Sequence, residues 1–390
     1  MDLAGIGVKM WDEKKIKRFR KALLDWYDKE KRDLPWRRTQ NPYFIWVSEI
    51  MLQQTRVDTV IPYYERFLAT FPTIKDLAEA PEETLLKCWE GLGYYSRVRN
   101  MQKAAIQVME EFGGEFPNTY DGILSLKGIG PYTAGAIASI AFGLPEPAVD
   151  GNLMRVISRL FEVNLDIGNP SNRWAFQKIA EILIDPDRPG DFNQALMDLG
   201  SDIESPVNPR PQESPVKDFS AAYLNGTMHI YPIKKPKKKP TPMKWRAFVV
   251  QDEQGRFLVE KNTQADLLSG FWHFPLIRDF STIGESIDLF EGVLEESSNY
   301  EINQNIPLEV QFESIYRMKL TPIRLLPKSV KHIFSHQRWD IELQYANVSG
   351  EVKNNSSRTL KWVTKEEMKL LPQSRVQGKM CEILVGQELL

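Results

Sequence analysis

The spacing of apolar and polar residues divides the chain into two parts with different periodicity. Up to about residue 225, apolar residues recur at the intervals of amphipathic helices, with glycine and proline between the runs. Asn41 followed by Pro42 predicts the start of one helix, because asparagine caps helix N-termini and proline fits the first turn. That helix carries Trp46 and Ile50 on one face. The pattern therefore predicts an all-helical domain over residues 1–225.

A stretch rich in proline and lysine, residues 226–242, interrupts this pattern. Proline fixes φ and removes an amide donor, so we predict an extended connector here. After it, alternating residues predict an α+β domain over 243–390, with a hairpin turn at 252–255, a helix near 284–296 and a short C-terminal helix. The predicted strands are 245–250, 255–259, 310–315, 331–335, 341–348 and 359–363.

The composition narrows the class of protein. The 390 residues suggest two or three domains, and 42% hydrophobic with 26% charged residues is typical of soluble globular proteins. We see no membrane span and no secretory signal, so we expect a cytoplasmic protein without a membrane partner. The only cysteines, Cys88 and Cys381, exclude a disulfide framework and any all-cysteine iron–sulfur site within one chain.

The distribution of charge points to nucleic acid only locally. The net charge is −2, but no acidic residue occurs between Asp218 and Asp252. A basic run of this kind is either a solvated linker or a track for phosphates, and the sequence leaves both interpretations open. Its members are Lys234, Lys235, Lys237, Lys238, Lys239, Lys244 and Arg246.

Residues 126–134, with the sequence LKGIGPYTA, predict a tight hairpin ahead of a helix. Gly128 and Gly130 permit close backbone approach, and the amides at the helix start suit a phosphate. By itself the pattern fits an ordinary turn equally well. Asp150 follows at the start of the next predicted helix, where it is a helix cap, an active carboxylate, or both.

Residues 126–152 resemble the helix-hairpin-helix-Gly/Pro-Asp superfamily of DNA glycosylases. Two further motifs, WVSEIMLQQTRV at 46–57 and EGLGYYSR at 90–97, resemble the MutY-type adenine glycosylases, which act opposite 8-oxoguanine. The match runs through roughly residues 15–225, and the region from Trp245 onward resembles the MutT/Nudix-like domain of the same family. The resemblance implies a base excision repair enzyme that flips adenine out of duplex DNA.

The resemblance also implies roles for four catalytic residues. Glu49 corresponds to the general acid that protonates adenine N7, and Asp150 to the carboxylate that stabilises the oxocarbenium ion or adds to it. Tyr132 and Asn152 lie beside Asp150, and Tyr132 replaces the lysine of bifunctional relatives, so we predict no strand cleavage. Apolar neighbours should raise the pKa of Glu49, whereas a helix N-terminus should hold Asp150 ionised.

Other positions carry over as contacts to the base and to DNA. Residues expected to line the adenine pocket are Trp36, Arg37, Leu52 and Gln194. Residues expected to contact DNA are Gln54, Thr55, Arg56, Tyr94, Gly128 and Gly130. The segment Phe334, Ser335 and His336 resembles the loop that distinguishes 8-oxoguanine, whose N7–H is a donor where guanine has an acceptor.

The chain departs from the family after the helical domain. Most relatives carry four cysteines there, which bind a [4Fe–4S] cluster. The corresponding loop, residues 200–220, has Glu204, Pro211, Ser214 and Ser220 at the ligand positions. Because the cluster needs thiolates, we predict a member without the cluster and without another cofactor.

The C-terminal domain is predicted to bind rather than hydrolyse. Residues 284–300 lack the intact acidic box of the pyrophosphatases and keep only Leu-Glu-Glu at 294–296. The alternatives are a thymine mismatch glycosylase of the same superfamily, a non-catalytic binder of damaged DNA, and a nucleotide pyrophosphatase. We expect a monomer that binds duplex DNA containing A:8-oxoguanine, with the connector as a candidate site for replication or repair proteins.

Overall fold

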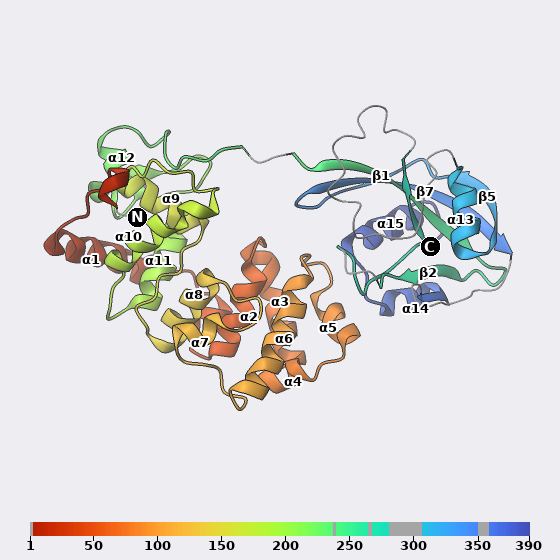
Figure 1. The fold of residues 1–390 in the computed structure, drawn as a ribbon, viewed down its shortest axis with the longest axis horizontal. Helices are drawn as coiled ribbons and strands as arrows, with labels where there is room; N and C mark the ends of the chain where they lie inside the picture. The colour runs from red at the N-terminus through yellow and green to blue at the C-terminus, as the bar shows by residue number, and fades with distance from the viewer. Residues whose placement is uncertain (1–2, 237–238, 264–266, 281–305, 350–358) are drawn as a thin grey trace. The chain divides into compact units, whose positions relative to one another are not determined.

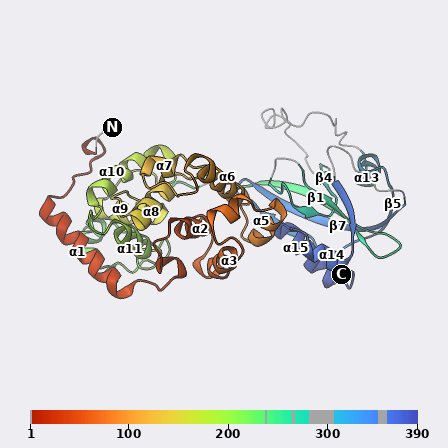
Figure 2. The same ribbon diagram turned by 90° about the horizontal axis from the view of Figure 1, so that it is seen from below.

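The computed structural model describes residues 3–236, 239–263, 267–280, 306–349 and 359–390. They form two compact units, shown in Figures 1 and 2. The first takes the chain up to Ala80 and from Ser96 to Lys237, and the second combines Pro81–Tyr95 with Lys238–Leu390. Within the described residues, no helix is both long and apolar enough to cross a membrane.

The first unit is helical and has two groups of helices, which Figure 1 shows within that unit. One group is built on α1, α9, α10 and α11, whose apolar faces share a core around Phe19, Phe176 and Phe192. The other contains α2 and α8, which pack directly against each other. The helices of the unit are α1 (Glu13–Glu30), α2 (Pro42–Leu52), α3 (Val57–Thr70), α4 (Ile74–Ala78), α6 (Ser96–Glu111), α7 (Tyr120–Leu124), α8 (Pro131–Phe142), α9 (Gly151–Phe161), α10 (Arg173–Leu183), α11 (Pro189–Ser201) and α12 (Ala221–Leu224).

Helix α2 begins where the sequence predicts. The Asn41 side chain accepts a hydrogen bond from the Tyr43 amide at 2.9 Å, and Pro42 is the first helical residue. The helix is not half-exposed, as an amphipathic pattern would suggest. Nearly every residue from Ile45 to Met51 is buried, because α2 lies at the centre of the unit. Glu49 is therefore carried into an apolar interior.

Helix α11 connects the two groups, since it packs against α1, α9 and α8. Its Asn193 side chain accepts from the Ala148 amide at 3.1 Å and donates to Ser139 Oγ and to the Glu146 carbonyl, each at 2.9 Å. These bonds satisfy buried polar groups and fix the segment that leads into Asp150.

The second unit is built on a mixed β-sheet. Its longest strands, β1 and β7, run parallel in register from the pair Thr241 and Gln337 to the pair Gln251 and Asn347. The path through the sheet is β3-β2-β1-β7-β5, while β4, β6 and β8 pair with β1, β7 and β2. The strands are β1 (Thr241–Gln251), β2 (Phe257–Lys261), β3 (Trp272–His273), β4 (Leu276–Asp279), β5 (Lys319–Leu325), β6 (Val330–Ile333), β7 (Gln337–Ser349) and β8 (Thr359–Val363).

Helices cover both faces of this sheet (Figure 2). Ala247 and Val249 of β1 face α14 (Lys365–Leu370) and α15 (Arg375–Val385), whereas Phe248 and Val250 face α13 (Leu308–Tyr316). This two-sided burial explains the continuous apolar run in β1, because successive side chains of a strand point to opposite faces. Helix α5 (Glu82–Trp89) also belongs to this unit.

The fold class, an all-α unit followed by an α+β unit, is confirmed, as is the hairpin of β1 and β2. The strand predicted at 310–315 is wrong, because those residues lie in helix α13. Phe312 and Tyr316, four residues apart, face the sheet, and Val310 is 50% exposed. The alternation of apolar and polar residues in this segment suggested a strand, but tertiary packing determines the outcome. Strand β5 was not predicted, and the helix expected at 284–296 lies outside the described residues.

Candidate active site

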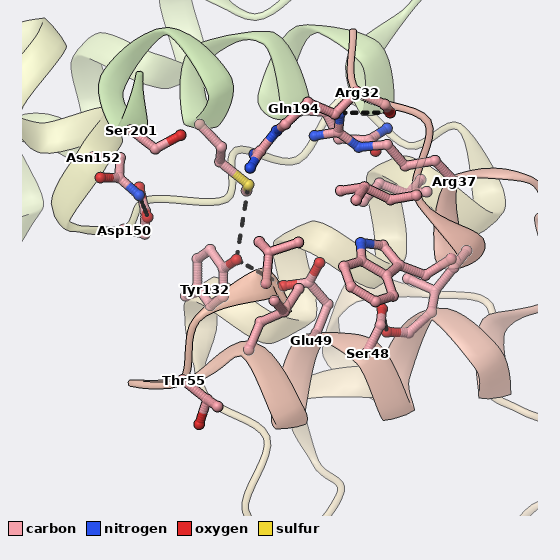
Figure 3. Close-up of a pocket in the computed structure, with 17 residues that line it drawn as sticks. Arg32, Arg37, Ser48, Glu49, Thr55, Tyr132, Asp150, Asn152, Gln194 and Ser201 are labelled. Atoms are coloured by element: carbon pink, nitrogen blue, oxygen red, sulfur yellow. Dashed lines mark hydrogen bonds between the residues drawn. The ribbon is translucent and has the colours of Figure 1, made fainter. Parts of the chain in front are cut away.

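A pocket of about 220 Å³ lies in the helical unit, between α2 and α8 on one side and α9 and α11 on the other. Figure 3 shows its side chains converging from these elements. The predicted site residues that line it are Trp36, Arg37, Glu49, Leu52, Thr55, Tyr132, Asp150, Asn152 and Gln194. Segments far apart in the sequence, such as those that carry Trp36 and Gln194, thus meet in one pocket.

Glu49 is the buried carboxyl of the pocket, with 6% of its surface exposed. The Tyr132 hydroxyl donates a hydrogen bond to Glu49 Oε2 at 2.7 Å. Burial raises the pKa of Glu49 to about 7; the Tyr132 hydrogen bond and the Arg37 charge oppose this rise, and the Asp150 charge adds to it. The expectation of a raised pKa is confirmed, and Glu49 can hold a proton near neutral pH.

Asp150 lies at the N-terminus of α9, which it caps. Its carboxylate accepts from the Leu153 amide at 2.7 Å and from Asn152 Nδ2 at 2.8 Å. Loss of solvent nevertheless raises the pKa of Asp150, and the hydrogen bonds and the Arg155 charge only partly oppose this. The hydrogen bonds at the helix terminus favour the charged form of Asp150, but desolvation has the larger effect on its pKa.

Asn152 is itself fixed by a buried arginine. Arg155 Nη2 donates to Asn152 Oδ1 at 2.6 Å, and Arg155 Nε donates to the Glu204 carbonyl at 2.7 Å. Helix α11 approaches closely here, because a Cβ at Gly200 would lie 2.9 Å from the Asn152 Cβ. The amide that donates to Asp150 is thus held by packing and by a second hydrogen bond.

Tyr132 is the hydrogen-bond partner of Glu49 in the pocket. Its hydroxyl donates to Glu49, and the Met197 sulfur lies 3.8 Å from the same oxygen. Burial raises the pKa of Tyr132 well above its usual value, and both carboxylates add to the effect. The side chain is therefore a neutral hydrogen-bond donor.

The pocket also contains residues that the sequence analysis missed. Arg32 lines the rim near Arg37, and both guanidinium groups donate to Asp198 of α11. No local motif marks these positions, because they come from different elements and are ordinary surface residue types. The other additional lining residues are Leu34, Ile45, Ser48, Val57, Ile140, Met197 and Ser201.

A second hollow of about 520 Å³ is lined by Glu49, Tyr132 and Asp150 as well. Its outer side carries Gln54 and Arg173. Gln54 has a φ of 59°, in the left-handed region that costs a non-glycine residue energy. This strained residue lies two positions after Leu52, the last residue of α2, and its strain and exposure suggest a ligand-binding role.

The hairpin before α8 requires its first glycine. Gly128 has a φ of 78°, and a Cβ there would lie 2.6 Å from the Asn100 Cβ. Gly130 caps α8, with Pro131 in the first turn and no side chain accepting from the helix amides. Gly130 lines the larger hollow, and Gly128 lines a smaller one with Asn100. The N-terminus of α8 can therefore receive an anion.

Three groups of predicted residues lie outside the pocket lined by Glu49. Arg56 is an exposed residue at the start of α3, and Tyr94, in the second unit, is 46% exposed with a φ of 48°. Phe334, Ser335 and His336 form the turn between β6 and β7. Apart from Phe334, which is partly buried, these residues are exposed polar or aromatic side chains on turns or helix ends.

The turn between β6 and β7 has one anchored residue and two exposed ones. Phe334 packs against Trp339, with ring centroids 4.8 Å apart, and its amide donates to the Gln337 carbonyl at 2.7 Å. Ser335 and His336 are exposed at the tip. The turn thus exposes a hydroxyl and an imidazole group to solvent.

The loop that corresponds to the cluster site contains a buried polar network. Glu204 Oε2 lies 3.6 Å from Arg159 Nη1, and Ser214 Oγ donates to Glu204 Oε1 at 3.1 Å. Ser220 Oγ donates to the Arg159 carbonyl at 3.1 Å, and Pro211 begins a 3₁₀ turn. Burial raises the pKa of Glu204, and the charge of Arg159 opposes the rise.

These four side chains do not fit an iron–sulfur cluster. Three of the ligand positions carry oxygen groups that already have protein partners, and Pro211 has no donor. Cys88 and Cys381 are far from this loop in the sequence. In the part of the chain that the structure describes, no group of three or more histidine, cysteine, aspartate or glutamate side chains could hold a metal ion.

The chain matches two family models. Residues 47–222 match the HhH-GPD superfamily of base excision DNA repair proteins, and residues 246–382 match the NUDIX domain. The chain is 35% identical to the adenine DNA glycosylase of Arabidopsis thaliana over 406 residues, which cover 90% of this chain but only 62% of the length of that protein.

Two mammalian proteins are matched over more of their length. The adenine DNA glycosylase of Rattus norvegicus is 33% identical over 94% of this chain and 77% of that protein. The adenine DNA glycosylase of Homo sapiens is 32% identical over 97% of this chain and 76% of that protein. With this coverage, and with Glu49, Tyr132 and Asp150 in one pocket, the chain belongs to the adenine DNA glycosylase family of the HhH-GPD superfamily.

Proposed function

We propose that the protein is a monofunctional glycosylase that removes adenine from duplex DNA opposite 8-oxoguanine or guanine. The observation that carries the proposal is the pairing of two carboxyl groups in one pocket. Glu49, with a pKa of about 7, can retain a proton, and Asp150 accepts two hydrogen bonds that favour its charged form. Glycoside hydrolysis uses an acid and a carboxylate in the same way.

The proposed reaction assigns one task to each group. The flipped adenine enters the pocket, and Glu49 transfers its proton to N7 while the bond between C1′ and N9 breaks and its electron pair moves to the base. The sugar becomes an oxocarbenium ion, which Asp150 stabilises or attacks, and water completes the hydrolysis. Tyr132 keeps its hydrogen bond to Glu49, and Asn152 keeps Asp150 oriented.

Single-turnover base release tests the activity. Glu49→Gln and Asp150→Asn should each lower the rate on A:8-oxoguanine duplex by at least about 10²-fold, the usual contribution of a general acid. Glu110→Gln, an exposed glutamate of α6, is the matched control and should cleave normally. Release of thymine from T:G duplex, or undiminished activity of both variants, would overturn the proposal.

We further propose that the β6–β7 turn distinguishes 8-oxoguanine from guanine. The support is its geometry, in which Phe334 is anchored and Ser335 and His336 are exposed. In the double variant Ser335→Ala with His336→Ala, the ratio of the rate of adenine release from A:8-oxoguanine to that from A:G should be smaller than in the wild type. An unchanged ratio of the two rates would contradict this assignment.

We also propose that the protein carries no iron–sulfur cluster. The support is the chemistry of the loop, where Glu204 pairs with Arg159 and no thiolate is present. Protein purified without oxygen should contain no stoichiometric iron. About four iron atoms per chain would contradict the proposal.

A further inference from the structure

Asp198 is a buried carboxylate just outside the pocket, and the reaction described above does not use it. It lies on α11, and 7% of its side chain is exposed. Arg37 donates to it with two nitrogens, at 2.7 Å to Oδ2 and at 2.9 Å to Oδ1. Arg32 donates to Oδ1 with Nε at 3.1 Å and also with Nη2. One buried carboxylate thus holds two guanidinium groups.

Arg37 is the member of this cluster that matters for Glu49. Its side chain is only 12% exposed, and it lines the same pocket as Glu49. Figure 3 shows the two side chains entering the pocket from different elements. If the Arg37 guanidinium left Asp198, it could pair with the Glu49 carboxyl group in the same pocket. That ion pair would favour the charged form of Glu49, which has lost the proton that the reaction needs.

We propose that Asp198 is a positioning residue, which holds Arg37 at α11 and so keeps its guanidinium from pairing with the carboxyl group of Glu49. The bidentate geometry supports this, because two parallel N–H bonds fix the plane of a guanidinium as one contact would not. Burial supports it too, since an arginine enclosed to this degree needs a counter-charge. The inference rests on the proposed adenine-releasing activity.

The other charged and titratable groups around Glu49 do not hold the Arg37 guanidinium, as Asp198 does. Asp150 opposes ionisation of Glu49 but is tied to Asn152 and Leu153, and Tyr132 donates to Glu49 directly. The charged and titratable groups that line a pocket together with Glu49 come from η2 (Pro35–Arg37) and the segment before it, α8, the start of α9 and α10, and they are Arg32, Arg37, Tyr132, Asp150 and Arg173. Asp198 of α11 holds the first two of these.

The test is the pH dependence of single-turnover adenine release. In Asp198→Asn, the pH at which the rate falls should move down by at least about one unit, the effect of an opposite charge beside a carboxyl. Asp198→Glu keeps the charge and should keep the wild-type midpoint. The double variant Asp198→Asn with Arg37→Gln removes the free guanidinium and should restore the midpoint, whatever its rate.

A merely structural role would give a different result. It predicts that Asp198→Asn lowers the rate equally at every pH, with an unchanged midpoint, and this would overturn the proposal. If Asp198→Asn does not fold, the single variant Arg37→Gln is used to test the proposal. Asp198 keeps a counter-charge in this variant, because Arg32 still pairs with it. Its midpoint should rise, and a fall would overturn the proposal.

Failure of the proposed activity can be separated from failure of this inference. If the wild type releases no adenine at any pH, the activity is wrong. The role of Asp198 can then be tested by urea unfolding. Titration of Glu49 makes the stability depend on pH, and Asp198→Asn should shift this dependence to lower pH. An unchanged dependence would overturn the inference independently of catalysis.

Discussion

Replacing Glu49 with glutamine should stabilise the folded protein at alkaline pH. Burial raises the pKa of Glu49 from 4.5 to about 7. Between these values the folded carboxyl keeps a proton that the unfolded one has lost, so stability falls as pH rises through this window. At about 1.4 kcal/mol per pH unit, the wild type loses about 3 kcal/mol by pH 8. Glutamine has no proton to lose and avoids this cost.

The assay is urea unfolding of the full-length protein near pH 5 and near pH 8. Hydrogen exchange of α2 and α8 amides assigns the transition to the helical unit, which matters because a chain with two units need not unfold in one step. The stability advantage of Glu49→Gln should grow by about 2.5 kcal/mol between the two pH values. Glu110→Gln, at an exposed position of the same unit, should show no such growth.

Two results would refute the reasoning. If the advantage of Glu49→Gln is the same at both pH values, the folded carboxyl is not protonated near neutrality and burial does not control it. If the advantage appears only at low pH, the pKa has been lowered rather than raised. In either case the assignment of Glu49 as the proton donor loses its physical basis.

Three other substitutions, one of them with a matched control, give independent tests. Tyr132→Lys places an amine beside Asp150 and should confer strand nicking through a Schiff base, seen on a denaturing gel; no nicked strand would contradict the site geometry. Gly128→Ala should cost at least about 1 kcal/mol and weaken DNA binding, because φ is 78° and the new Cβ meets Asn100, whereas Gly130→Ala, with nothing within 4 Å, should cost less stability. Glu204→Gln should destabilise the helical unit by about 3 kcal/mol in urea unfolding, since Arg159 would remain buried without its counter-charge, and a neutral effect would show that the pair is dispensable.

The sequence predicted those parts of the site that lie in continuous motifs. Glu49 stands in a helix beside Trp46, Ile50 and Met51, so its burial and its raised pKa could be anticipated. Asp150 was located for the same reason, as a cap at a helix start. The upward shift of its pKa was not anticipated, because the balance between desolvation and hydrogen bonding depends on tertiary packing that no local pattern reports.

Features made by distant segments were not predictable in this way. Asp198 meets Arg32 and Arg37 across more than 160 positions of the chain, and each is an unremarkable residue in its own helix or turn. Helix α13 was taken for a strand because Val310 and Phe312 alternate with polar residues, although the sheet contacts it through Phe312 and Tyr316. In both cases the observed structure depends on contacts between residues far apart in the sequence.

Helix α11 ties the range of bases that the pocket can accept to the stability of the fold. One face of this helix carries Gln194, which lines the pocket. Its Phe192, Leu196 and Leu199 belong to the hydrophobic core of the helical unit. Widening the pocket by displacing this helix would also open the core. We therefore expect variants selected for a larger base to acquire compensating changes in the core, far from the pocket, before they acquire changes in its walls.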